Sequence, residues 1–234
     1  PDSGRLHEEE ADFANRIGSA RHRPALPLYT EQEAYASLEY LEAVDFGQPF
    51  QVADTFTLRF DVAGHILGSA TVHCTLPDGV TVRFSGDLGR PNHPVLAPAE
   101  PVGDADFILV ESTYGDRTHN PDDPVERLES LINRTVDRGG VLVIPAFAVD
   151  RTEVLLYHLG ALARAGRLPA VPVFVDSPMA LAALQVYRKA LSEGRADIRP
   201  ELRGDGRLFE VPLLEENETP EGSKKISRRT ESAI

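Results

Sequence analysis

The chain has 234 residues, enough for one large domain or two smaller ones with a real hydrophobic core. Its hydrophobic content of 41% is ordinary for a globular protein, and no apolar run approaches the ~20 residues of a membrane span. The net charge of −13 argues against a broadly basic nucleic-acid-binding surface, although it leaves room for a nuclease whose positive charge is local or supplied by metal.

Two helices are predicted before residue 50. Residues 8–17 begin with three glutamates, and acids in a first turn are favoured by the helix dipole. After a loop over residues 18–29, Thr30 and Glu33 have the spacing of a capping box. The helix that they begin is expected to reach Val44, because its apolar positions follow the helical period.

From Gln51 the apolar period changes to two, which is typical of half-buried strands. It predicts strands over residues 56–62, 70–76 and 80–84, the last two joined by a Pro-Asp-Gly turn. A proline-rich loop follows over residues 90–104. The apolar run at residues 107–110 then predicts a short strand that ends at Glu111.

The second half alternates between helical patterns and apolar strands, which favours parallel βαβ units. Residues 195–210 read as a loop, and residues 216–231 as a loop or short helix. The predicted elements are helices over residues 123–138, 151–164 and 179–192, with buried strands over residues 141–144 and 171–175.

Two turns carry the first candidate site. His65 and Asp87 each follow a strand-like run, are flanked by glycines, and offer ligand types that zinc prefers. A single histidine or aspartate in a turn is more often a hydrogen-bonded structural residue. The pairing changes this interpretation, because a hairpin between the two positions would bring the strand ends side by side.

Other strand ends offer further candidates, since functional groups in such sheets collect at the carboxyl ends of strands. Glu111 could be a ligand, a general acid or base, or an orienting group, and the structural alternative is a cap. Arg151 starts a helix and is well placed to meet a phosphate. Ser177 follows a strand and precedes a proline, so a plain N-cap is its alternative.

The remaining histidines are weaker candidates. His73 is expected in the core or on a sheet face, because it lies in the middle of a predicted strand. His93 and His119 fall in loops near Asp87 and Glu111, where they could line a cleft, but surface positions are expected for both.

Taken together, four stretches resemble the metallo-β-lactamase-fold nucleases of the β-CASP group. This group includes the endonuclease subunit of the pre-mRNA cleavage and polyadenylation machinery and its bacterial and archaeal relatives. The likeness extends over most of residues 1–180. It rests on residues 63–70 (AGHILGSA), 85–87 (SGD), 111–115 (ESTYG) and 144–151 (IPAFAVDR).

The resemblance implies a mechanism and roles for single residues. His65 would bind one zinc ion, and Asp87 would bridge two. Glu111 would belong to the first motif of the β-CASP region and support a catalytic histidine further along the chain. The two metals would activate a water or hydroxide for in-line attack on a phosphodiester, with substrate near Arg151 and Ser177.

The resemblance also implies a fold and a boundary. The expected class is α/β (α+β), with residues 1–116 in part of an αββα metallo-β-lactamase domain and residues 117–234 in part of a parallel-sheet β-CASP domain. The family's His-x-His-x-Asp-His motif and later histidines are not in this sequence, so an internal fragment is expected. With two of about seven implied ligands, it should bind zinc weakly and cleave nothing.

Several functions remain open at this point. The first is a zinc-dependent ribonuclease, and the second is a hydrolase of the same fold that acts on DNA or a small ester. A metal-free scaffold is the third, although His65 and Asp87 are retained. A Rossmann-like nucleotide binder ranks low, since no Gly-x-Gly-x-x-Gly follows a strand.

The sequence and the family resemblance also predict binding partners and a cell compartment. Single-stranded RNA is the expected partner, a homodimer is a further expectation, and no membrane association is expected. Cys74 is the only cysteine, so no intrachain disulfide can form and the cytoplasm is the expected compartment.

Overall fold

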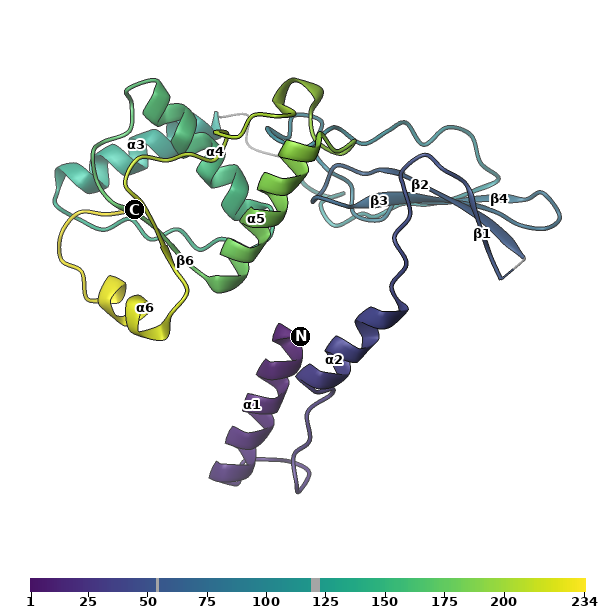
Figure 1. The fold of residues 1–234 in the computed structure, drawn as a ribbon, viewed down its shortest axis with the longest axis horizontal. Helices are drawn as coiled ribbons and strands as arrows, with labels where there is room; N and C mark the ends of the chain where they lie inside the picture. The colour runs from purple at the N-terminus through teal and green to yellow at the C-terminus, as the bar shows by residue number, and fades with distance from the viewer. Residues whose placement is uncertain (54, 119–122) are drawn as a thin grey trace. The chain divides into compact units, whose positions relative to one another are not determined.

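The computed structural model describes residues 1–53, 55–118 and 123–234. Figure 1 follows the chain by colour from its N-terminus to its C-terminus. Its internal contacts divide it into two compact units, Pro1–Asp45 and Phe46–Ile234. The predicted division into residues 1–116 and 117–234 rests on the family resemblance and stays a prediction.

The first unit is helical. Its elements are α1 (Asp2–Ile17), α2 (Glu31–Ser37) and the 3₁₀ turn η1 (Leu38–Tyr40). The predicted capping box is confirmed, because the Thr30 hydroxyl accepts from the Glu33 N–H while the Glu33 carboxylate accepts from the Thr30 N–H. The prediction that this helix reaches Val44 is wrong. The side chains of Leu41 and Val44 are 73% and 42% exposed, so no packed face extends the helix.

In the second unit, five of the described strands form one sheet in the order β1-β2-β3-β4-β5. Neighbours pair antiparallel except β4 and β5, which are parallel. The three strands predicted between residues 56 and 84 and the one after residue 106 are confirmed. The bounds are β1 (Phe50–Val52), β2 (Phe56–Val62), β3 (Ala70–Thr75), β4 (Thr81–Phe84) and β5 (Phe107–Leu109).

The second half of the chain holds four helices, a 3₁₀ turn and a small parallel sheet within its described residues. The sheet pairs β6 (Val173–Asp176) with β7 (Leu214–Asn217). The other elements are α3 (Pro124–Asp137), α4 (Arg151–Arg164), α5 (Pro178–Glu193), η2 (Pro200–Leu202) and α6 (Pro220–Ser227). Parallel pairing and the three predicted helices are therefore confirmed, and α6 is the short helix that the polar tail allowed.

The predicted buried strand over residues 141–144 is wrong. Val141 forms a single bridge with Ala233, and the Leu142 N–H donates to the Ala233 carbonyl. Within the described part of the chain no ladder continues from this bridge, and the Val143 side chain is 77% exposed. A run of β-branched residues becomes a strand only where a neighbouring backbone continues beside it.

The main hydrophobic core lies in this second half. Figure 1 shows α3, α4 and α5 gathered around β6, and buried side chains from all four elements belong to one cluster. Val95 and Leu96, from the loop after β4, are fully buried in the same cluster. Because this loop also follows Asp87, its buried residues tie the Asp87 segment to the core that contains α4 and α5.

The observed class is mixed α/β, as predicted from the sequence. Among the described residues, no helix combines the length and the apolar character that crossing a membrane requires.

Candidate functional site

His65 lies in a tight loop that follows β2. The Ser69 hydroxyl accepts hydrogen bonds from the His65 and Ile66 N–H groups at 2.9 and 3.2 Å. Gly64 has a φ of +66°, and a Cβ there would lie 2.3 Å from the Ala97 carbonyl oxygen. Only glycine tolerates both the positive φ and this close approach, so the small residues predicted around His65 have a steric reason.

Asp87 lies in the loop that follows β4, and this loop packs directly against the His65 loop. The Gly89 N–H donates to the Ala63 carbonyl at 2.9 Å. A Cβ on Gly89 would lie 1.8 Å from the Gly64 carbonyl oxygen. The two backbones therefore approach as closely as glycine permits, and this contact brings the two predicted ligands to one place.

Glu111 follows β5 and holds the Asp87 loop. One carboxylate oxygen accepts from the Leu88 N–H at 3.0 Å, and the other accepts from the Thr113 N–H at 3.2 Å. Hydrogen bonds from Thr113 and Leu88, with a smaller contribution from nearby His65, hold the pKa of Glu111 below its ordinary value. The side chain is therefore an ionised acceptor that fixes the backbone beside Asp87.

These strand ends converge on one pocket of about 720 Å³. His65, Asp87 and Glu111 line it, and Arg151 lines it from the first turn of α4. The predicted convergence of four segments is thus observed. Ser177 is not among the lining residues, and its hydroxyl caps α5 by accepting from the Ala180 N–H.

A second group of residues, His93 and Asp150, lines this pocket, so for His93 the alternative of lining a cleft is the one observed. His93 was expected at the surface, and this prediction is wrong because the side chain is 3% exposed. Its Nδ1 accepts from the Val95 and Leu96 N–H groups, so Nε2 carries the proton that faces Asp150 at 3.1 Å. His119 lies outside the described residues.

Asp150 connects the pocket to the core. It precedes α4 with a φ of +69°, which is strained for a residue with a Cβ. Its other partner is the Tyr187 hydroxyl, which donates at 2.9 Å and accepts from the Leu67 N–H at 3.2 Å. Burial raises the pKa of Tyr187 well above its ordinary value, so the phenol stays protonated. This chain of contacts ties the His65 loop to α4 and α5.

A buried carboxylate lies in the first turn of α4. Glu153 is 0% exposed, and neither of its carboxylate oxygens has a hydrogen-bond partner within the residues that the structure describes. Burial raises its pKa from 4.5 to about 7, and the nearby Asp150 charge adds to the rise.

The donor chemistry of the pocket suits a metal ion, but only in part. His65, Asp87 and Glu111 bring an imidazole and two carboxylates to one cavity, and these are ligand types that zinc takes. Across residues 1–53, 55–118 and 123–234, no group of three or more candidate ligand side chains is arranged to hold a metal ion. The residues present therefore fit a contribution to a metal centre, not a complete one.

Comparison with known proteins gives a domain match. Residues 152–234 match the Beta-Casp domain. The match covers α4 except for its first residue, Arg151, and continues through β6, α5 and β7 to residue 234.

Similar proteins come from all three domains of life. Ribonuclease TTHA0252 of Thermus thermophilus is 32% identical over 203 residues, which are 86% of this chain and 46% of that protein. The RNase J-like protein of Methanocaldococcus jannaschii is 29% identical over 159 residues, covering 64% and 37% of the two chains. Cleavage and polyadenylation specificity factor 73 of Drosophila melanogaster is 31% identical over 180 residues, covering 75% and 26%. The chain thus spans less than half the length of these relatives.

Proposed function

Because the chain belongs to the β-CASP family of metallo-β-lactamase-fold proteins, we propose that the whole protein is a metal-dependent hydrolase of RNA phosphodiester bonds. One observation supports this most directly. His65, Asp87 and Glu111 line the same pocket as Arg151. Metal ligands beside a guanidinium are the combination that binds a phosphodiester and neutralises its charge.

The proposed metal is zinc, with two ions in the whole protein. His65 would bind one ion, and Asp87 would bridge both. When bound, the metals supply a nucleophilic water and positive charge for the scissile phosphate. Among the described residues this chain holds only part of the ligand set that the family implies for the whole protein. We therefore expect this chain alone to bind zinc weakly and not to cleave RNA.

The chain's own residues would position this chemistry. Glu111 holds the Leu88 N–H and so fixes the loop that carries Asp87. Arg151, at the first position of α4, would bind a phosphate oxygen together with the helix N-terminus. Ser177 stays a predicted substrate contact whose cap leaves the hydroxyl proton able to donate.

The test is cleavage of labelled single-stranded RNA by the whole protein, with single-stranded DNA alongside. Asp87→Ala should abolish cleavage, because the residue would bridge the metals. Asp104→Ala is the matched control, since it removes an exposed carboxylate outside the pocket. Equal cleavage by the Asp87 variant and the parent would overturn the site assignment.

The same experiment separates the other functions. Cleavage of DNA but not RNA would favour the DNA hydrolase, and failure to cut either polymer in zinc-loaded protein would favour a small-ester hydrolase or a scaffold. For this chain alone, substoichiometric zinc after washing with chelator is expected, whereas stoichiometric zinc would contradict the partial ligand set.

The cell compartment and assembly remain part of the proposal. The single cysteine supports the cytoplasm, where thiols stay reduced. The homodimer stays a prediction, which sedimentation of the whole protein would test.

A further inference from the structure

A row of nitrogen-bearing side chains crosses the five-stranded sheet away from the proposed active site. Arg59 on β2 pairs directly with His73 on β3, and His73 pairs directly with Arg83 on β4. Directly paired residues project from the same face of a sheet, so the three side chains stand next to one another. Like charges in such positions destabilise the sheet unless negative charge compensates them.

Asp61 compensates one end of the row. Its side chain is 4% exposed, and one carboxylate oxygen lies 2.7 Å from an Arg59 terminal nitrogen and 2.9 Å from His73 Nε2. The same Arg59 nitrogen donates to His73 Nδ1 at 3.0 Å. The Asp61 negative charge therefore balances the Arg59 positive charge, whereas the buried His73 Nε2 lies close to Asp61 without forming a hydrogen bond.

Arg83 has no such compensation. Its Nε is buried without a hydrogen-bond partner, and its guanidinium forms no ion pair with any residue that the structure describes. The Nε of Arg59 is also buried and unpartnered. Guanidinium donors without acceptors carry a desolvation cost that an anion would remove.

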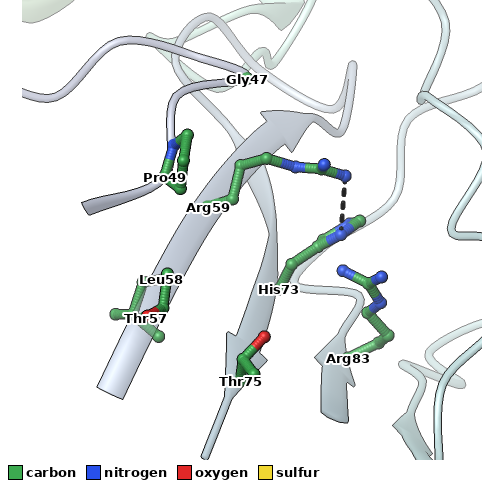
Figure 2. A pocket seen from close by; sticks show the side chains of 8 residues that line it. All are labelled: Gly47, Pro49, Thr57, Leu58, Arg59, His73, Thr75 and Arg83. Carbon is green, nitrogen blue, oxygen red and sulfur yellow. Dashed lines mark hydrogen bonds between the residues drawn. The ribbon is translucent and has the colours of Figure 1, made fainter. Parts of the chain in front are cut away.

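These donors surround a pocket of about 220 Å³. Figure 2 shows the Arg59 and Arg83 side chains extending toward His73 from the two flanking strands. Thr57 and Thr75 bring hydroxyl groups to the same lining. The complete lining is Gly47, Pro49, Thr57, Leu58, Arg59, His73, Thr75 and Arg83, none of which lines the proposed active site.

We propose that this pocket binds a phosphate-class oxyanion. Two guanidiniums face it against one carboxylate that is already engaged, so its net charge is positive in a chain whose total charge is −13. Guanidinium forks match the spacing of phosphate oxygens, and threonine hydroxyls can donate to the same group. The ligand is either a free phosphate or a backbone phosphate of nucleic acid, and the site does not depend on the proposed cleavage activity.

The experiment is a titration of the whole chain with inorganic phosphate in the presence of chelator. The observable is the set of arginine Nε–H resonances in ¹H–¹⁵N spectra. We expect the Arg59 and Arg83 signals to shift together. Arg83→Gln should weaken binding about tenfold or more, because it removes a charged hydrogen-bond donor. Arg138→Gln removes an exposed arginine at the end of α3 and should leave binding unchanged.

A further variant, a competition experiment and a folding control distinguish the two possible sources of the anion and exclude loss of binding through unfolding. Arg83→Lys keeps the charge without the fork and should bind with intermediate affinity. Displacement of phosphate by a short single-stranded RNA, lost in Arg83→Gln, would identify nucleic acid as the source, and phosphate binding without displacement would identify a free phosphate. Near-ultraviolet circular dichroism checks that each variant is folded. Equal phosphate affinity in the parent and a folded Arg83→Gln would overturn the proposal.

Discussion

Glu153→Gln should raise the stability of the protein at alkaline pH. In the folded chain Glu153 is fully buried, both carboxylate oxygens lack hydrogen-bond partners among the described residues, and the pKa is raised from 4.5 to about 7. Above pH 7 the folded protein therefore carries an uncompensated buried charge. Glutamine keeps the shape of the side chain and removes that charge.

The sign and size follow from proton linkage. A carboxyl whose pKa is higher in the folded state binds more protons there, so the free energy of unfolding falls as pH rises between 4.5 and about 7. Below pH 4.5 both states are protonated and the penalty vanishes. Above pH 7 it is complete and amounts to at most about 3 kcal/mol, at 1.36 kcal/mol per pH unit of difference between the two pKa values.

The assay is urea unfolding of parent and variant at pH 5 and pH 8. We expect the variant's advantage to grow by about 2 kcal/mol between the two, which is a rise in melting temperature of roughly 4–8 °C at pH 8. Glu126→Gln is the control, because Glu126 occupies the corresponding first-turn position of α3 but is exposed. It should show no such growth. Identical pH dependence in the Glu153 variant and the parent would refute the reasoning.

Three other perturbations test the contacts that build the two units. Tyr187→Phe removes the donor to Asp150 and the acceptor of the Leu67 N–H, and should cost about 1–3 kcal/mol in urea unfolding; an unchanged midpoint would contradict the bridging role. Gly89→Ala should unfold the site loop or shift the melting temperature steeply, because the new Cβ would lie 1.8 Å from a carbonyl oxygen. A Gly206→Ala variant, also in a loop but with open space around it and no positive φ, provides the comparison, and equal melting of the two would disprove the close approach. Thr30→Ala should reduce the helical circular dichroism of residues 1–45 and cost about 1 kcal/mol; no loss would mean that the capping box contributes nothing in solution.

The predictions that held are those with a local physical cause. Thr30 and Glu33 cap a helix through atoms three residues apart, so their spacing alone carries the information. The alternation before His65 and Asp87 predicted strands that end shortly before those residues, because side-chain period follows directly from strand geometry. The convergence of both turns with Glu111 followed from placing chemistry at strand ends.

The predictions that failed needed a partner far along the chain. Residues 141–144 have the composition of a strand, but the structure offers Val141 only a single bridge to Ala233. The helix predicted to reach Val44 stops early because no surface in its unit covers that apolar face. Composition states what a segment prefers, and packing decides whether that preference is met.

The amino-acid sequence by itself determined the turn chemistry of the candidate site. It placed His65, Asp87 and Glu111 at strand ends, and the glycines at 64 and 89 that allow the loops to touch are already visible in it. Only the tertiary structure decided that His93 is buried against Asp150 and that two arginines of one sheet face share a pocket. The physical reason is sequence separation, because a hydrogen bond across 57 residues depends on how whole elements pack, and no spacing rule within a segment records that.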